Sequence, residues 1–191
     1  LEILATRLRE ISKPMIIAAN KIDIKGAEDN LKYIQKEFPN YKIIPCSAES
    51  EFALREAVIN ELVDYTPGDN HFKIKGNLND KQNQGLEFIK ENIISKFNST
   101  GLQEVVNTTV FDILDYIAIH PGGSNKLEDS KGNVLPDCFL MPRGSTAIEF
   151  AFRLHSDIGN GFIKAIKVKT KEVIGKEYKL DNLDIVEIKT N

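Results

Sequence analysis

Two short apolar segments, each followed at once by polar residues, constrain the fold of the first third of the chain. The segments are residues 15–19 and 42–46, and an amphipathic helix around Leu31 is expected between them. A further helix is expected over residues 52–62. Strands that alternate with helices predict a parallel sheet of the α/β class. Ligands of such sheets bind beyond the carboxyl ends of the strands, which is where both polar segments fall.

The first polar segment is Asn20–Asp23 and the second is Ser47–Glu49. The Asp23 carboxylate can accept two parallel hydrogen bonds, from the ring N–H and the exocyclic amine of guanine. Adenine lacks both donors, so it would leave a buried carboxylate unpaired, at a cost on the order of several kcal/mol. In this order the two segments resemble the guanine-recognition half of a GTP-binding domain. They predict a binding site for GTP or GDP.

The other residues of the two segments have complementary predicted roles. The Asn20 amide can bond the base edge and tie the neighbouring loops together. Lys21 can lay its aliphatic stem along the base and ribose while its ammonium group stays in water. The backbone N–H of Ala48 is predicted to donate to the guanine oxygen, and Ser47 is predicted to hold the loop shape. Glu49 is the last residue of the second polar segment and is included in the candidate site.

A purely structural alternative is open for both segments. Asp23 could cap the helix that begins near Ala27, and Ser47–Glu49 could open the next helix. In that case the two segments would have only a structural role, at the N-termini of two helices.

No Gly-x-x-x-x-Gly-Lys-Ser/Thr loop occurs in the sequence, so no backbone cradle for phosphates is available. The chain begins with Leu1, Leu4, Leu8 and Ile11 on one helical face, and a domain rarely begins within a helix. We therefore expect the C-terminal part of a longer protein, whose phosphate-binding half lies upstream. Mg²⁺ is expected only in that longer protein. We assign no catalytic residue here and expect no hydrolysis of GTP by this chain alone.

Composition is that of an ordinary globular protein, with 191 residues of which 41% are hydrophobic and 28% charged. The net charge of −3 does not indicate a nucleic-acid binder by bulk electrostatics. Cys46 and Cys138 are too few and too far apart to suggest a disulfide framework or a zinc site. No run approaches the ~18 apolar residues of a membrane span, and a cytoplasmic location is expected.

The middle of the chain is expected to be a loop followed by two helices. Residues 67–85 are polar and contain Pro and Gly, which predicts a long loop with His71 as a solvated side chain. Apolar residues at spacings of three and four then predict helices over residues 86–97 and 102–114, each with one face in a core. Asn98–Gly101 separates these helices as a turn.

From Tyr116 the pattern changes to strands around one helix. Thr146 and Glu149 form a capping box that opens the helix, which is expected to end near Gly159. Strands and a single helix predict a small α+β domain of the β-grasp type. The expected strands are residues 116–119, 138–141, 162–168, 171–174 and 184–188. The expected regions are therefore residues 1–66 (the C-terminal half of a nucleotide-binding domain), 67–115 (a loop and helical segment) and 116–191 (the β-grasp domain).

Three segments of the last region resemble a TGS domain, namely Asp129–Pro136, Met141–Thr146 and Leu154–Gly159. The stretch Leu180–Val186 is also typical of its last hairpin and strand. The TGS domain is the ubiquitin-like module shared by threonyl-tRNA synthetases, certain GTPases and stringent-response enzymes. Together with Asn20–Asp23, the chain resembles the C-terminal half of an Obg-related GTPase of the YchF type, in its archaeal-like branch. The resemblance implies that the nucleotide contains guanine.

The resemblance also implies a ribosomal or RNA partner for the TGS domain. Residues 138–191 hold nine Lys or Arg and seven Asp or Glu, a slightly basic balance. Three lysines between residues 167 and 171 alternate with other residues, so on one extended strand they would share a face. The candidate RNA contacts are Arg143, Arg153, Lys167, Lys169 and Lys171. The open alternative is a solvated sheet face, where lysines discourage edge pairing.

Three other classes of protein can be compared with this sequence, and one of them stays open. A binding module with a vestigial nucleotide site, docking on RNA or a ribosome, remains an alternative. A ubiquitin-like modifier is disfavoured because Glu187–Asn191 contains no terminal Gly-Gly. A synthetase would leave Asn20–Asp23 without a role. His155 is expected to bond the last-turn carbonyls of its helix, and His120 is expected to be a linker residue.

Overall fold

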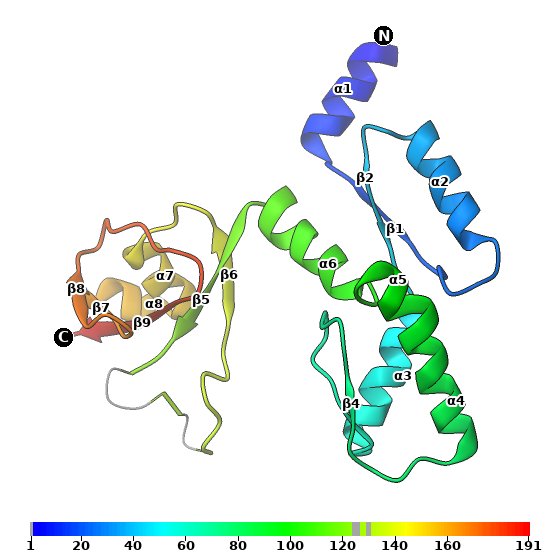
Figure 1. The fold of residues 1–191 in the computed structure, drawn as a ribbon. Coiled ribbons are helices and arrows are strands. Elements are labelled where there is room, and N and C mark those ends of the chain that lie inside the picture. Colours follow the sequence, from blue (N-terminus) through cyan, green and yellow to red (C-terminus); the bar gives the residue numbers. More distant parts are fainter. Residues whose placement is uncertain (1, 124–126, 129–130) are drawn as a thin grey trace. The chain divides into compact units, whose positions relative to one another are not determined.

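The computed structural model describes residues 2–123, 127–128 and 131–191 (Figure 1). Asp129 and Ser130, the first residues of the predicted TGS segments, lie outside the described residues. The chain forms two compact units, Leu1–Thr109 and Val110–Asn191. Among the described residues, the first unit has two two-stranded sheets and two apolar clusters, and the second has one five-stranded sheet and one apolar cluster.

The first unit contains the predicted parallel strands. Strand β1 (Ile16–Ala19) pairs in parallel with β2 (Lys42–Pro45), and the helix α2 (Ala27–Glu37) connects them. The register runs from Ile16 opposite Lys42 to Ala19 opposite Pro45. The α/β arrangement expected from the two apolar segments is therefore confirmed. Because the strands are parallel and in register, the residues after both strands leave the sheet at the same edge.

Helices make up most of the remaining first unit. The chain begins with α1 (Glu2–Ser12), on which Leu4 and Leu8 are exposed. Helix α3 starts directly after β2, four residues earlier than expected from the sequence. The helical segments after β1 and β2 are α3 (Ala48–Ile59), α4 (Asp80–Ile89), the π-helical turn η1 (Lys90–Ile94), α5 (Ser95–Phe97), α6 (Leu102–Asn107) and the π-helical turn η2 (Thr108–Ile113), whose last four residues belong to the second unit.

Residues 67–85 are not one continuous loop, contrary to the expectation from their polar composition. Strand β3 (Val63–Asp64) pairs antiparallel with β4 (Lys73–Ile74), and α4 already begins at Asp80. The Asn79 side chain accepts from Gln82 N–H, and the Gln82 side chain in turn accepts from Asn79 N–H. This reciprocal capping box starts α4 within the polar stretch.

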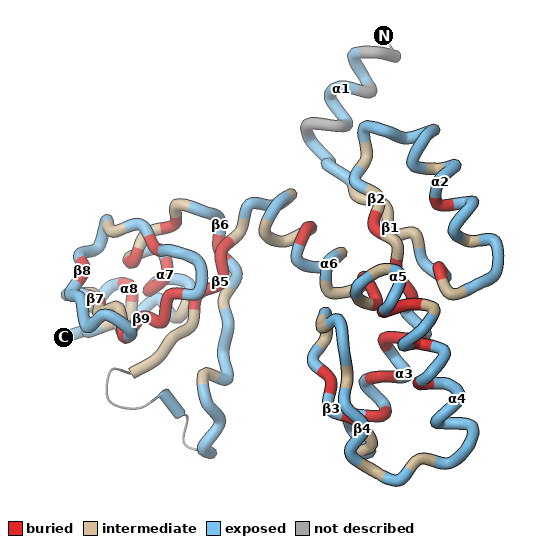
Figure 2. The backbone as a smooth tube through the Cα atoms, in the orientation of Figure 1, coloured by how far each residue is buried: buried red, intermediate tan, exposed pale blue. Residues whose placement is uncertain are grey.

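Two apolar clusters hold the first unit together (Figure 2). The larger lies between α3, β3 and α4 and contains Leu54, which is fully buried. In the smaller, Ile93 of η1 packs with Ile22 and Leu31, next to β1 and α2. The segment α4–η1–α5 therefore supplies side chains to both clusters, as its predicted apolar face requires.

The second unit is a mixed five-stranded sheet in the order β6-β5-β9-β7-β8. The central pair β5 and β9 is parallel, and all other neighbours are antiparallel. The strands are β5 (Tyr116–Pro121), β6 (Phe139–Pro142), β7 (Phe162–Lys167), β8 (Glu172–Ile174) and β9 (Asp184–Thr190). The predicted succession of an α/β part and a smaller α+β part is confirmed.

Two short helices follow β6 where one was expected. Helix α7 (Ala147–Leu154) starts at the predicted capping box, with Thr146 and Glu149 bonded in both directions. His155 follows its last residue and is also the N-cap of α8 (Ser156–Asn160). Phe150 of α7 is fully buried in the core against the sheet. The amphipathic pattern predicted the helical region, and the extended backbone of His155 divides it.

A buried carboxylate connects α3 to two distant segments of the first unit. Glu51 is only 5% exposed. It accepts hydrogen bonds from Thr100 Oγ1 at 2.6 Å, Arg55 Nε at 2.7 Å and Tyr65 Oη at 2.8 Å. Burial by itself raises the pKa of Glu51, but the three hydrogen bonds favour the charged form more strongly and leave that pKa lowered. Burial and the neighbouring Glu51 raise the pKa of Tyr65.

We expect Glu51→Gln to lower the free energy of unfolding by about 1–2 kcal/mol at pH 7, because hydrogen bonds to a charge become neutral ones. A carboxyl whose folded pKa is lowered contributes stability above its unfolded pKa and loses it as pH falls through the folded pKa. The difference between variant and wild type should therefore shrink below about pH 4. Urea unfolding at several pH values measures this, with Glu56→Gln, on the exposed side of α3, as control. A difference independent of pH would contradict the assignment.

Candidate functional site

The two predicted recognition segments meet beyond the ends of β1 and β2. The hydrogen bonding between the strands continues into the loops, since Cys46 N–H donates to Ala19 O at 3.0 Å and Ile22 N–H donates to Cys46 O at 3.2 Å. We call residues 20–26 the first loop and residues 46–48 the second loop. Their backbones are thus joined directly at the sheet edge.

Asn20 connects the two loops through its side chain. Its Oδ1 accepts from Lys21 N–H at 2.8 Å and from Ala48 N–H at 3.0 Å. Because two backbone N–H groups donate to this one atom, it must be the amide oxygen. The amide nitrogen of Asn20 therefore takes no part in joining the loops. Asn20 is exposed, and its two amide N–H groups have no partner among the described residues. The predicted role of Asn20 as a tie between the loops agrees with this geometry.

Lys21 adopts an uncommon backbone conformation. Its φ is +65°, in the left-handed region that non-glycine residues rarely occupy. Its side chain is exposed. Backbone strain of this kind concentrates at functional sites, because the surrounding structure must enforce it. Here the bond from Lys21 N–H to the Asn20 side chain stabilises the strained turn.

Asp23 does not serve as a helix cap. The N-cap of α2 is Gly26, at φ +85°, and no side chain caps this helix. Within the part of the chain that the structure describes, Asp23 Oδ1 is the buried side-chain oxygen that has no hydrogen-bond partner. A buried acceptor without a donor is costly, at about 1–3 kcal/mol. The helix-cap alternative for Asp23 is therefore wrong, because neither α2 nor any other described segment supplies a donor to this oxygen.

Ser47 shapes the second loop and also opens α3. It is fully buried, and its Oγ accepts from Ser50 N–H at 3.2 Å and donates to Ser50 Oγ at 2.8 Å. Its own N–H donates to Thr100 O at 2.9 Å. Glu49 is exposed in the first turn of α3, where a negative charge suits the helix dipole. The second loop thus leads into the N-terminus of α3. Its backbone is hydrogen-bonded to the first loop through Cys46 O and to Thr100 O through Ser47 N–H.

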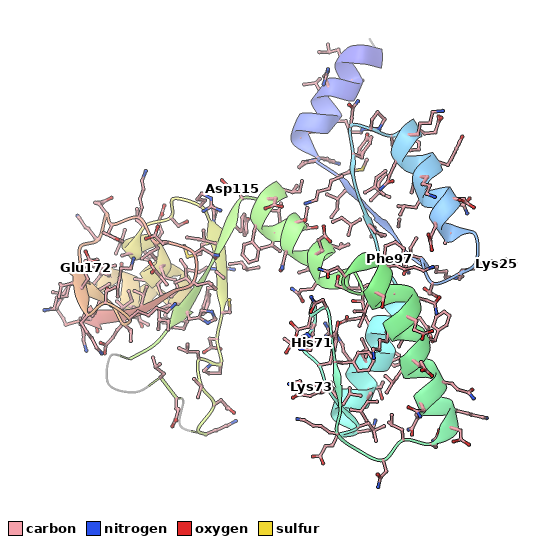
Figure 3. All side chains as sticks on the ribbon, viewed as in Figure 1. Lys25, His71, Lys73, Phe97, Asp115 and Glu172 are labelled. Carbon is pink, nitrogen blue, oxygen red and sulfur yellow. The ribbon has the colours of Figure 1, made fainter. Side chains whose placement is uncertain are left out.

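Two hollows border the first loop. One, of about 280 Å³, is lined by Asn20, Lys21 and residues of α2. The other, of about 410 Å³, is lined by Asp23 and by Phe88, Asn92 and Lys96 from the segment α4–η1–α5. Lys25, in the loop between β1 and α2, borders both hollows (Figure 3). Asn20 and Lys21 therefore line one hollow, and Asp23 lines the other.

The predicted lysine face of the second unit does not exist as one strand. Strand β7 ends at Lys167, residues 168–171 form a turn, and Lys171 has φ +59°. Alternating residues therefore do not share a sheet face here. Lys169 and Lys171 are exposed, and Lys169 Nζ donates to Leu183 O at 3.2 Å.

Lys167 is an internal group of the second unit. Its Nζ lies 3.1 Å from both Asp181 Oδ2 and Asp184 Oδ1, and 5.3 Å from the centre of the Tyr178 ring. Burial lowers the pKa of Lys167, but the hydrogen bonds to Asp181, Asp184 and Tyr178 outweigh burial and raise that pKa well above its ordinary value. Lys167 is paired with two carboxylates and its side chain is only 13% exposed, so it is a weaker candidate for an RNA contact than the exposed lysines.

The two arginines of the predicted basic patch differ in their surroundings. Arg143 is exposed and pairs with Asp115 through its Nε. Arg153 is exposed in the last turn of α7. The structure thus leaves Arg143, Arg153, Lys169 and Lys171 at the surface of the second unit.

The histidines have local roles. His155 was expected to bond the carbonyls that end α7, but its Nδ1 instead accepts from Asp157 N–H at 3.2 Å and caps α8. His120 was expected in a linker but lies in β5, opposite Ile185 of β9, with its Nδ1 2.9 Å from Asp137 O. His71 Nδ1 lies 3.0 Å from Asn70 Oδ1. Among the described residues, no group of three or more His, Cys, Asp or Glu could hold a metal ion. No described helix is long and apolar enough to cross a bilayer.

Two residues that support the site carry little or no local signal in the sequence. Glu51 was not distinguished from the exposed acids of α3, and Thr100 was assigned to a simple turn. The spacing of Glu51 to Leu54, both buried on one face of α3, is the signal that could have identified the first. Thr100 carried no signal, because its contacts are with residues about 50 positions earlier in the chain.

Known proteins share both units of this chain. Residues 18–122 match the family described as Obg-like GTPase YGR210-like, G4 motif-containing domain, and residues 130–190 match the TGS domain. The chain is 42% identical over 186 residues to the uncharacterized GTP-binding protein MJ1332 of Methanocaldococcus jannaschii, across 97% of this chain and 47% of that protein. It is 29% identical over 161 residues to the uncharacterized GTP-binding protein C428.15 of Schizosaccharomyces pombe, across 77% and 38% of the two chains.

A solved structure also matches. The crystal structure of a GTP binding protein from Pyrococcus horikoshii OT3 is 38% identical, with a TM-score of 0.68 across 98% of this chain and 48% of that one. The chain spans about half the length of the relatives that it matches over nearly all its residues. It belongs to the YGR210-like family of Obg-like GTPases and carries a TGS domain, as the resemblance of its sequence predicts.

Proposed function

We propose that the first unit binds guanine nucleotides, GTP or GDP, through its two loops. Asp23 carries this proposal most directly, because it lines the larger hollow and one oxygen of its carboxylate has no hydrogen-bond donor, while guanine offers two donors side by side. Adenine offers neither, so the same carboxylate would select against it. The names of the relatives, which describe GTP-binding proteins, support the same ligand.

The remaining residues of the loops have defined tasks in this proposal. The free amide N–H groups of Asn20 donate to the acceptor edge of the base, while its oxygen holds the loops together. Lys21 covers one face of the base with its aliphatic stem. The guanine oxygen shares the Ala48 N–H with Asn20 Oδ1, and Ser47 and Glu49 keep that N–H at a helix N-terminus, where partial negative charge is stabilised.

Catalysis belongs, in this proposal, to a form of the protein with a phosphate-binding loop. The present sequence offers base contacts but no Gly-x-x-x-x-Gly-Lys-Ser/Thr cradle. We therefore assign GTP hydrolysis, and Mg²⁺ with it, only to a longer chain that contains one.

We further propose that the TGS domain contacts RNA, on the ribosome in the cytoplasm. The exposed basic side chains Arg143, Arg153, Lys169 and Lys171 are the candidate phosphate contacts. Lys167 is withdrawn from this set because Asp181 and Asp184 neutralise it.

The chain alone should bind GDP with a dissociation constant of about 1 mM, because the base contacts are present without a phosphate cradle. Titration followed by NMR or calorimetry measures this affinity, with ADP as the control nucleotide. GTP turnover by the pure chain should be undetectable. Micromolar affinity for GDP, or measurable GTP hydrolysis, would contradict the proposal that this chain supplies base contacts but no phosphate binding or catalysis. Absence of any base-selective binding would favour the alternative of a binding module with a vestigial site.

In a form of the protein with a phosphate-binding loop, Asp23→Asn should change base preference. The amide presents one donor and one acceptor, so guanine loses a hydrogen bond while xanthine, with a carbonyl in place of the amine, gains one. We expect GTP affinity to fall about tenfold or more and xanthosine triphosphate to become the better ligand. Asp80→Asn, an exposed residue at the start of α4, is the matched control. An unchanged preference for GTP in Asp23→Asn would remove Asp23 from the site.

Charge reversal should weaken RNA binding by the second unit. We expect Lys169→Glu with Lys171→Glu to reduce co-sedimentation with ribosomes severalfold at low salt, and the wild-type signal itself to fall steeply as salt rises. Lys176→Glu with Lys179→Glu, two exposed lysines of the same unit, changes the net charge equally and serves as control. Equal loss in both pairs would indicate bulk charge, and no loss in either would exclude this surface.

A further inference from the structure

A turn far along the chain lies directly against the second loop. Residues 98–101 connect α5 to α6, and Thr100 and Gly101 within them are buried. Thr100 O accepts the hydrogen bond from Ser47 N–H at 2.9 Å. The backbone of the second loop is thus bonded to the first loop on one side and to this turn on the other.

Gly101 allows an unusually close approach to the end of β2. A Cβ atom at this position would lie 2.0 Å from Pro45 O and 2.9 Å from Cys46 Cα, which is closer than real Cβ contacts. Its φ of +81° also lies in the left-handed region. A larger residue would therefore push the end of β2 and the second loop away from the turn, because the nearest atoms belong to the backbone.

Thr100 also reaches the helix that follows the second loop. Its Oγ1 donates to Glu51 Oε2 at 2.6 Å, one turn into α3. The turn therefore contacts the strand end at Pro45, the loop at Ser47 and the first turn of α3 at Glu51. Ala48, whose N–H is assigned to the guanine oxygen, lies between these three fixed points.

We propose that Thr100 and Gly101 are positioning residues for base recognition, which set the place of the Ala48 N–H relative to Asn20. This inference rests on the proposed guanine site. Hydrogen bonds weaken steeply with distance and angle, so a displaced Ala48 N–H no longer contributes to the recognition of the guanine oxygen. Neither residue contacts the base itself in this arrangement.

The test is nucleotide titration of the ¹⁵N-labelled chain and its variants, followed by NMR. Gly101→Ala introduces the clash, and Gly144→Ala is the matched control because it has φ +88° but open space around a Cβ. Two ligands are compared, GDP and 6-thio-GDP, in which a weakly accepting sulfur replaces the guanine oxygen. Wild type and Gly144→Ala should prefer GDP about fivefold, the value of one neutral hydrogen bond.

In Gly101→Ala the preference for GDP over 6-thio-GDP should fall to nearly one, and the Ala48 amide resonance should shift. If Gly101→Ala does not fold, Thr100→Val decides, because it keeps the backbone and removes only the bond to Glu51; its preference should fall about twofold. A variant that lost affinity for both nucleotides equally would show a merely structural role and overturn the inference. Unchanged affinity and preference in both variants would also overturn it. Failure of wild type to bind either nucleotide would instead refute the proposed function, and this inference with it.

Discussion

One side-chain oxygen organises the site on which the proposed function depends. Asn20 Oδ1 accepts a backbone N–H from its own loop, at Lys21, and another from the second loop, at Ala48. Asparagine suits this position because it combines an acceptor for the protein with two donors for a ligand. An aspartate would accept the same two N–H groups but would present no donor to the base. The same oxygen bonds Lys21 N–H and so stabilises the left-handed backbone conformation of Lys21, two residues before Asp23.

A second layer of polar contacts lies beneath that bridge. Glu51 remains charged in a buried position because three donors converge on it, and one of them comes from Thr100. Ser47 joins the same layer through its N–H. Parallel strands bring the two loops together, and this layer holds the second loop in position from the side away from the first. Local sequence thus creates the loops, and contacts between distant segments fix their geometry.

The sequence allowed the strands β1 and β2, the loops at their ends and the capping box of α7 to be predicted, because apolar runs and cap residues are local signals. The start of α3 was placed too late because Ser47–Glu49 was assigned to a loop, whereas Ser47 is the N-cap of the helix. Strands β3 and β4 have two residues each, too few for any periodicity. The alternation at Lys167–Lys171 resembled a strand, but the chain turns after Lys167, and Lys171 N–H donates back to Lys167 O at 2.8 Å. The unpartnered oxygen of Asp23 is a property of packing, which no pattern reveals.

The most direct test of the two-loop site is to map where GDP contacts the chain. In an NMR titration of the labelled protein with GDP, the side-chain amide of Asn20 and the backbone N–H of Ala48 should shift together, and ADP at equal concentration should leave both unchanged. Shifts confined to residues outside both loops and both hollows would contradict the account, as would equal shifts with ADP.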